Sequence, residues 1–344
     1  MTGNRFFAAA NTGVGFLSRF HEIFDPKKHD EIYIIKGGAG TGKSTFMKRL
    51  GEEAERRGFL PEYYYCSSDI HSLDGLVIRE IDVCVLDGTA PHVTEARYPG
   101  AVETVLDFGA AFDVSALKRE RAKITALSEN VSERYSRAYA ALRAAHMTMA
   151  ERLRVCRSFY LSEKAEAAAG RLLSGMSRGK TDAVGICTFC GEGRVRLPVF
   201  FDAAKKTVAV GDFYGIESLF LADIERVALA RGISAKISRD PVCPDMAESV
   251  YFDKDGVYIA SSAEESDKSV NPRRFADVGA LKDERGYLRL LKKLETGAKE
   301  CAVSSLKQAA DVHKELEEIY IEHTDFSVID GIFEKTKRKI FEKG

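Results

Sequence analysis

A glycine-rich run directly after a strand-like segment constrains this chain more than any other feature. Residues 34–45 read IIKGGAGTGKST, with β-branched residues before the glycines and a lysine and two hydroxyls after them. Glycine adopts backbone conformations that other residues avoid, so such a run can wrap and point successive N–H groups inward. Residues 31–36 have the composition of a buried strand, and residues 43–57 carry one apolar helical face. The run is therefore predicted to join a strand to a helix.

The same run fits the pattern G-x-x-x-x-G-K-[ST] without a mismatch. It resembles the Walker A motif of P-loop NTPases, in which backbone N–H groups and the following helix N-terminus hold phosphates. The lysine then contacts the β- and γ-phosphates, and the serine hydroxyl binds Mg²⁺. We expect ATP and Mg²⁺ as ligands, with ATP favoured over GTP because no guanine-reading motif is evident. The predicted binding residues are Gly37, Gly38, Ala39, Gly40, Thr41, Gly42, Lys43, Ser44 and Thr45.

A P-loop site also needs an acid at the end of a neighbouring strand. Four apolar residues, Val83 to Leu86, end in Asp87, which resembles the Walker B acid that holds Mg²⁺ through water. Ser44 and Asp87 are therefore the predicted metal residues, with Asp69 or Asp74 as the alternative acid. His92, five residues past Asp87, is predicted to sense phosphate or shuttle a proton, or else to be an exposed loop histidine. Lys43, Asp87, His92 and Asp69 are the predicted catalytic residues.

One expected residue is missing from this region. Gly88 follows Asp87, where many ATPases that drive motion place a glutamate that polarises water. Either hydrolysis is slow, or another residue positions water, or the acceptor is not water. The segment Cys66–Asp69 ends a second predicted strand, and such strand ends face ligand in open α/β sheets. Ser67, Ser68 and Asp69 are thus further site residues, with a capping turn as the alternative.

Residues 111–169 have a different composition. They contain no glycine or proline, and apolar residues recur at spacings of three, four and seven. This pattern predicts one or two long helices, either as a projecting hairpin or coiled-coil arm or as a bundle packed on the sheet. Helical segments dominate again after about residue 285. The alternation predicts four parts: an α/β half at 1–110, a helical arm at 111–170, a second α/β half at 171–280 and a helical segment at 281–344.

The two α/β parts carry an internal repeat. A shift of 174 residues (211 − 37) places Gly37 on Gly211 and Ser44 on Ser218, with strands and helices in the same order. The alternative is two unrelated units of similar spacing. The second copy lacks the phosphate chemistry, because Glu217 stands where Lys43 stands and Asp212 adds a further negative charge. Ser261 replaces Asp87. We expect this half to be a degenerate copy that does not bind a triphosphate.

Composition excludes some functions. The chain has 344 residues, 45% of them hydrophobic, and a net charge of −1, so nucleic acid is not an expected ligand. No signal peptide or membrane-spanning segment is evident, and seven scattered cysteines suggest reduced thiols in the cytoplasm. Cys187 and Cys190 form a C-x-x-C without a second pair at the spacing zinc requires, so buried or idle thiols are favoured over metal.

The segments RFFAAANTGVGF, IIKGGAGTGKST, YYYCSSDIHSLDG and VLDGTAPHV together resemble a bacterial family of tandem P-loop proteins described as ATPases or nucleotide-kinase-like. The resemblance covers nearly the whole chain and implies nucleotide binding. Near-continuous apolar strands that alternate with helices predict an α/β fold with a parallel sheet, duplicated in the two halves. In that family the second half commonly keeps its own P-loop, from which this chain departs at Gly211–Ser218.

Three functions follow from the sequence. The first is an ATPase that acts as a switch, with the helical arms reporting the nucleotide state to a protein partner. The second is a small-molecule or nucleotide kinase, which needs lid arginines such as Arg119, Arg121, Arg134 and Arg137. The third is an ATP-binding scaffold without activity.

Overall fold

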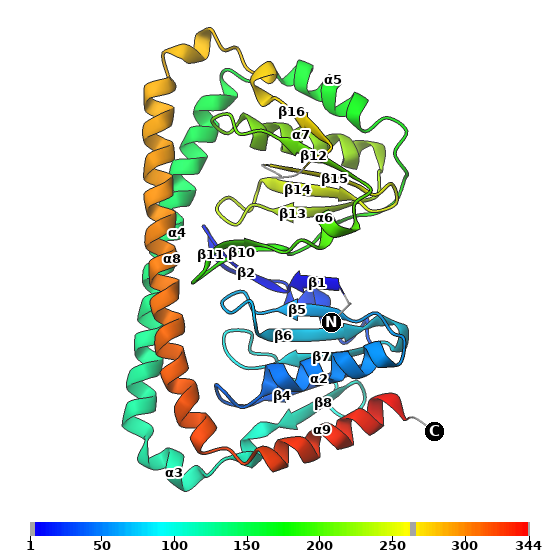
Figure 1. Cartoon of the computed structure of the whole chain (residues 1–344), viewed down its shortest axis with the longest axis vertical. Helices are drawn as coiled ribbons and strands as arrows, with labels where there is room; N and C mark the ends of the chain where they lie inside the picture. The colour runs from blue at the N-terminus through cyan, green and yellow to red at the C-terminus, as the bar shows by residue number, and fades with distance from the viewer. Residues whose placement is uncertain (1–3, 262–265, 343–344) are drawn as a thin grey trace.

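The chain folds into two α/β halves that are stacked along the long axis of the molecule. The structure is a computed structural model that describes residues 4–261 and 266–342. Figure 1 shows one sheet above the other, with two long helices, α4 and α8, running beside both. The strand before the glycine-rich segment and the strand before its repeat both run toward these long helices. The two loops therefore lie against the helices.

The sheet of the first half has six strands. In spatial order they are β1 (Asn4–Phe7), β5 (Glu62–Tyr65), β6 (Leu73–Ile78), β7 (Val83–Asp87), β4 (Glu31–Lys36) and β8 (Glu103–Asp107). Strand β4 precedes the glycine-rich loop, and β7 pairs with it in parallel, with Ile35 opposite Asp87. The predicted strand–loop–helix order is confirmed, because α2 (Lys43–Arg56) begins directly after the loop.

The prediction of a parallel sheet is wrong, because β6 runs antiparallel to both of its neighbours, β5 and β7. No strand was predicted between Asp69 and Val83, so this strand was missed. The two links that flank β6 are too short for the crossover of a dozen or more residues that parallel neighbours require. Short links impose hairpins, and the sheet is therefore mixed.

The second half repeats this topology strand for strand. Its sheet has the order β9 (Thr181–Ala183), β13 (Ala235–Arg239), β14 (Ala247–Phe252), β15 (Val257–Ser261), β12 (Lys206–Val210) and β16 (Lys268–Val270). The strand directions match those of the first sheet, with β14 as the antiparallel member. Even the bulges correspond: Asp74 is the extra residue in the first sheet, and Glu248, at 74 + 174, is the extra residue in the second. The predicted repeat is confirmed as a repeat of topology.

Helices and hairpins cover both faces of the first sheet. On one face lie α2 and the C-terminal helix α9 (Phe326–Phe341), whose rings Phe46 and Phe333 meet edge to face at 5.5 Å. On the other face lie α1 (Phe20–Ile23) and the hairpin of β2 (Ala9–Thr12) and β3 (Gly15–Ser18), with Phe20 and Phe24 buried. Burial on both faces explains the almost continuously apolar strands β4 and β7.

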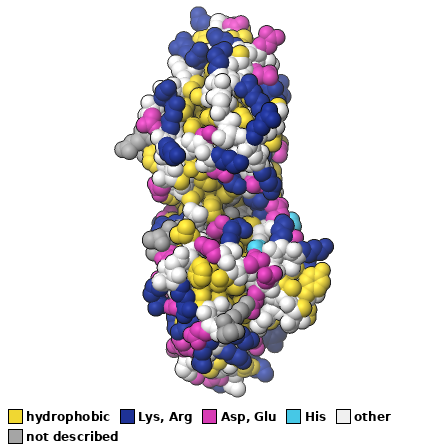
Figure 2. All heavy atoms as spheres, turned by 90° about the vertical axis from the view of Figure 1, so that its right-hand side faces the viewer, with side chains coloured by type: hydrophobic (Ala, Val, Ile, Leu, Met, Phe, Trp, Pro, Cys, Tyr) yellow, Lys and Arg dark blue, Asp and Glu magenta, His cyan; other side chains and the backbone are white. Residues whose placement is uncertain are grey.

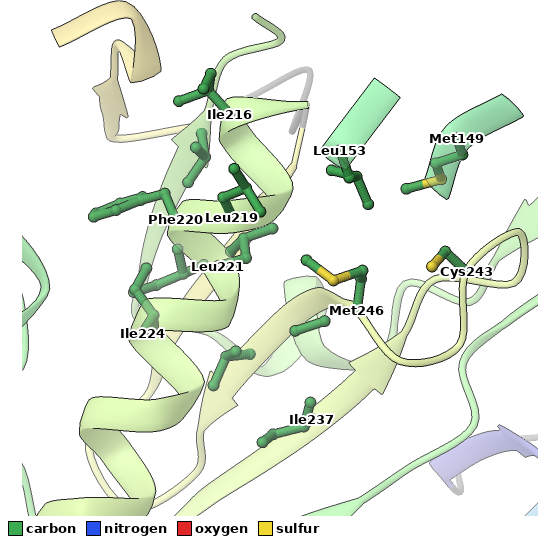
Figure 3. Close-up of a cluster of buried hydrophobic side chains, with 14 of the residues drawn as sticks. Met149, Leu153, Ile216, Leu219, Phe220, Leu221, Ile224, Ile237, Cys243 and Met246 are labelled. Atoms are coloured by element: carbon green, nitrogen blue, oxygen red, sulfur yellow. The ribbon is translucent and has the colours of Figure 1, made fainter. Parts of the chain in front are cut away.

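The second half is built around α7 (Ile216–Arg231), which packs on β14 and β15. Figure 3 shows Phe220 and Ile224 of α7 in a cluster that also takes Met149 and Leu153 from α4. The remaining elements of this half are α5 (Ser162–Leu172), α6 (Val199–Ala203) and the hairpin of β10 (Cys187–Cys190) and β11 (Gly193–Arg196). Helix α4 is thus part of the core of the second half.

The two long helices form an antiparallel pair. Helix α4 (Arg121–Arg157) follows the short α3 (Val114–Arg119) and packs along α8 (Arg285–Glu322). We call the pair of α4 and α8 the strut. Late residues of α4 meet early residues of α8, as in the pair Arg152–Glu295, and the buried seam includes Leu142 and Leu306. The predicted long helix therefore exists, but its partner helix comes from the 281–344 segment and not from a hairpin within 111–170.

The halves also touch directly. The Phe7 N–H donates to the Gly185 carbonyl at 2.7 Å, and the Asn11 side chain donates to the Phe189 carbonyl at 2.8 Å. Figure 2 shows the face away from the strut, where both lobes carry Lys and Arg interspersed with Asp and Glu. The direct contacts and the strut together hold the halves in one arrangement.

The seam of the strut gives the first prediction. Leu142→Ala should lower the free energy of unfolding by about 2–5 kcal/mol, because Leu142 is fully buried and truncation leaves a cavity. Met147→Ala is the matched control, since Met147 lies on the same helix and is 71% exposed. Urea denaturation of both variants measures the difference. Equal losses would show that α4 is not packed through Leu142.

Candidate functional site

The glycine-rich loop, residues 37–42, joins β4 to α2. Gly40 (φ 66°) and Gly42 (φ 81°) adopt left-handed conformations, which explains glycine at these two positions. No residue in the described part of the chain accepts a hydrogen bond from the N–H groups of residues 38–44. Unpaired donors at a helix N-terminus attract an anion.

Lys43, the first residue of α2, folds back onto this loop. Its ammonium donates to the Gly38 carbonyl at 2.6 Å and to the Gly37 carbonyl at 3.3 Å. It is 3.6 Å from the nearer carboxylate oxygen of Asp87, which ends the neighbouring strand. Both side chains are largely buried. The structure therefore brings together Lys43 and Asp87, as the sequence predicted.

The hydroxyls of the loop have different surroundings. The Ser44 hydroxyl accepts a hydrogen bond from the Leu73 N–H at 2.9 Å, which ties α2 to the start of β6. The Thr41 hydroxyl donates to the Gly38 carbonyl at 2.9 Å and closes the loop from within. Thr45 is exposed on the surface of α2. Ser44 is thus placed beside the sheet edge that holds Asp87.

His92 is neither an exposed loop residue nor free in a ligand-facing loop. It is buried and stacks on Phe20, with ring centroids 4.2 Å apart. Its Nε2 atom lies 3.0 Å from Asp74 Oδ2, an ion-pair distance at which the angles do not meet those of a hydrogen bond. Asp74 lies next to Asp87 across the antiparallel pair of β6 and β7, because the preceding pair in the register is Gly75 with Leu86. The sequence had offered Asp74 only as an alternative acid, and the strand that carries it was missed.

The Cys66–Asp69 segment has mainly connecting roles. Asp69 is exposed, and its carboxylate accepts the His71 N–H at 2.9 Å, as in the capping turn that was the alternative. Ser67 is buried, and its carbonyl accepts a hydrogen bond from the Asn11 side chain at 3.2 Å. The segment therefore belongs to the junction of the two halves more than to the surroundings of Lys43.

In the second half, the equivalent loop is filled by its own side chain. Glu217 folds back, and its Oε2 atom accepts the N–H groups of Phe213 at 2.9 Å and Gly215 at 3.0 Å. Burial raises the pKa of Glu217. The donors that remain unpaired in the first loop are therefore satisfied here by a carboxyl group, which occupies the place an incoming anion would need.

The strut contacts both loops, a feature that sequence reasoning did not predict. A Cβ atom on Gly38 would lie 2.7 Å from the ring of Tyr320, and one on Gly40 would lie 2.9 Å from the Glu317 carbonyl. At the second loop, a Cβ atom on Gly215 would lie 3.0 Å from Leu153 of α4. No spacing in the sequence signals these contacts, because they join segments that are 282 (320 − 38), 277 (317 − 40) and 62 (215 − 153) positions apart.

The two cysteines of the C-x-x-C motif are buried in β10, and burial raises the pKa of Cys187 to about 12. Among the described residues, no group of three or more His, Cys, Asp or Glu side chains is arranged to hold a metal ion. Cys187 and Cys190 thus pack in the junction of the halves as protonated thiols.

Comparison with family models, with curated proteins and with solved structures finds no match for this chain. Within residues 4–261 and 266–342, no helix combines the length and apolar character needed to cross a bilayer. The geometry of the site therefore carries the functional argument.

A second prediction concerns Glu217. Because its pKa is raised in the fold, the folded protein holds this proton more tightly than the unfolded chain. The stabilisation that the fold gains from this proton is complete below the ordinary pKa of 4.5. It is lost as the pH rises through the raised pKa of the folded state. Glu217→Gln cannot ionise and keeps an acceptor oxygen. Its unfolding free energy should therefore fall less than that of the wild type as the pH is raised from about 4.5 to 7.

Urea denaturation at several pH values measures this difference. Glu300→Gln, an exposed change on α8, controls for the loss of a carboxylate. If wild type and Glu217→Gln show the same dependence on pH, Glu217 does not titrate from a buried position in the second loop.

Proposed function

We propose that the glycine-rich loop binds the phosphates of Mg·ATP and that the protein hydrolyses ATP as a nucleotide-dependent switch. The observation that carries this proposal is the contrast between the two loops. The first keeps its N–H donors unpaired around Lys43, whereas the second fills them with Glu217. Unpaired donors beside an ammonium group suit a polyphosphate and would be costly to bury without one.

The residues at the first loop fit the parts of Mg·ATP. Lys43 and the backbone of residues 38–44 would hold the β- and γ-phosphates. The Ser44 hydroxyl and the Asp87 carboxylate would hold Mg²⁺, which neutralises phosphate oxygens when bound. At present Lys43 is held by loop carbonyls and by Asp87. These contacts keep a buried ammonium paired until a phosphate takes their place.

The glutamate that orients the attacking water in many ATPases would follow Asp87, where this chain has Gly88. We assign the orientation of water to Asp74, with His92 as the group that fixes it. Asp74 is the buried carboxylate next to Asp87 in the strand register, and its Oδ2 atom has no hydrogen-bond partner among the described residues. Its counterpart Glu248 in the second half lies at ion-pair distance from Arg194 and Arg196, whereas Asp74 lies at that distance from His92.

The surroundings of the long helices favour a switch over a kinase. A kinase lid needs mobile arginines, but Arg134 donates to Gln308 across the strut at 2.6 Å and Arg137 pairs with Glu133. Arg119 and Arg121 lie at the exposed α3–α4 corner. A strut that contacts both loops is instead suited to report the state of one half to the other, or to a protein partner that binds along it.

The third prediction tests the site. Lys43→Ala should weaken Mg·ATP binding by about tenfold or more, the effect of losing one charge-assisted hydrogen bond. It should also abolish release of labelled phosphate from [γ-³²P]ATP. Glu217→Gln is the matched control at the second loop and should still bind and hydrolyse ATP, because Lys43 and the first loop are unchanged.

Thermal stabilisation by Mg·ATP and labelled phosphate release are measured on the same samples, with and without added nucleosides. Labelled product other than free phosphate would establish a kinase. Unchanged ATP stabilisation in Lys43→Ala would contradict the assignment of the first loop, and loss of binding in Glu217→Gln would contradict the closed second loop.

A further inference from the structure

The C-terminal end of α8 rests on the glycine-rich loop. Gly38 and Gly40 approach Tyr320 and Glu317 so closely that a single added carbon has no room. The corner after α8 is fixed to the first half, because the Asp325 N–H donates to the carbonyl of Ala111, a core residue of that half, at 2.8 Å. A loop that adjusts to hold a phosphate must therefore move against α8, since close-packed groups have no free space between them.

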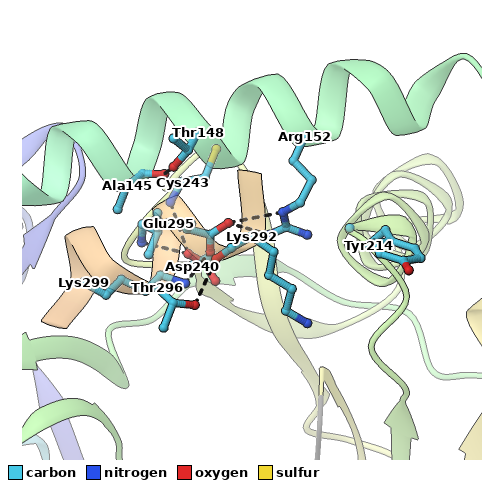
Figure 4. A network of polar contacts seen from close by, with 12 residues as sticks. Ala145, Thr148, Arg152, Tyr214, Asp240, Cys243, Lys292, Glu295, Thr296 and Lys299 are labelled. Carbon is cyan, nitrogen blue, oxygen red and sulfur yellow. Dashed lines mark hydrogen bonds and ion pairs between the residues drawn. The ribbon is translucent and has the colours of Figure 1, made fainter. Parts of the chain in front are cut away.

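The same helix contacts the second loop at its other end. Glu295 of α8 accepts two hydrogen bonds from Arg152 of α4, at 2.8 and 3.2 Å, and both side chains are buried (Figure 4). Arg152 also lies 4.0 Å from Glu217 and against Gly215. Lys292, one turn earlier on α8, pairs with Asp212 of the second loop. Arg152 is thus shared between the strut and the carboxyl group that closes the second loop.

A single helix connects these two contacts. Residues 295 to 320 belong to one uninterrupted α-helix, which at 1.5 Å per residue spans about 38 Å. The helix contains no proline and packs along α4 over its length. A displacement at Tyr320 therefore reaches Glu295 as a movement of a rigid element, and not through loops that would absorb it.

We propose that Tyr320 is a positioning residue for the glycine-rich loop, and that α8 transmits the occupancy of that loop to the Arg152–Glu217 contact at the second loop. In this account the second half is a sensor of the nucleotide state of the first. The inference rests on the proposed function, because it needs a ligand at the first loop. It gives a role to the second half, whose loop is occupied by Glu217 and is not expected to bind a triphosphate.

Hydrogen–deuterium exchange of residues 211–217 tests the inference, with and without Mg·ATP, in wild type, Tyr320→Phe and Tyr320→Ala. Mg·ATP binding is measured on the same samples. In wild type and Tyr320→Phe, exchange should change by about fivefold or more on binding, the lower end of allosteric couplings. Tyr320→Ala should bind Mg·ATP but lose this change, because the ring that contacts Gly38 is gone. A merely structural role of Tyr320 would not remove a nucleotide response at the far end of α8.

Glu295→Gln provides a second test that leaves the loop contact intact. Because coupling is reciprocal, this change at the Arg152 contact should alter Mg·ATP affinity at the first loop by about fivefold or more, whereas the exposed Glu300→Gln should not. Nucleotide binding in the wild type without any change in residues 211–217, or an unchanged response in Tyr320→Ala, would overturn the inference alone. Absence of binding in the wild type would overturn the proposed function, and with it the inference.

Discussion

The packing of α4 against α8 determines how the rest of the molecule is arranged. Each helix follows one α/β half in the chain and ends on the loop of the other half: α4 at Gly215 and α8 at Gly38 and Gly40. Without the seam through Leu142 and Leu306, the halves would keep only their direct junction. The antiparallel pair therefore connects two sites that neither sheet could bring together.

The two loops show how one backbone arrangement gives opposite results with different side chains. A glycine-rich turn before a helix presents N–H donors in both halves. In the first half the charged side chain is an ammonium group, so the donors and Lys43 together favour a multiply charged anion. In the second half the side chain is a carboxyl group that accepts those donors itself. Glutamate in place of lysine at this repeat position removes the attraction for an anion, and its carboxyl group occupies the place that the anion would take.

Local patterns allowed the prediction of local structure. The strand, loop and helix around Lys43, the closeness of Lys43 to Asp87 and the repeat of 174 residues all depend on short segments or on their order. Antiparallel β6 was missed because its LDGLVI segment contains aspartate and glycine, which are depleted in strands and typical of turns. The burial of His92 was missed because it depends on Phe20, a residue distant in sequence.

The contacts of the strut were beyond sequence reasoning for a similar reason. Apolar spacing predicted that residues 111–169 form long helices, but spacing does not identify the helix that packs against them. That α8 is the partner, and that Tyr320 reaches Gly38, follows from tertiary packing. The role that we propose for the second half likewise depends on Glu217, Arg152 and Glu295 lying together, which no local pattern predicts.

The central claim is that one loop of this duplicated chain is open to a nucleotide and the other is closed by its own carboxyl group. Isothermal titration of Mg·ATP into the full chain tests this most directly, because it counts the sites. The account predicts one nucleotide bound per chain. Two nucleotides per chain would show that Glu217 does not close the second loop, and none would show that the first loop does not bind ATP.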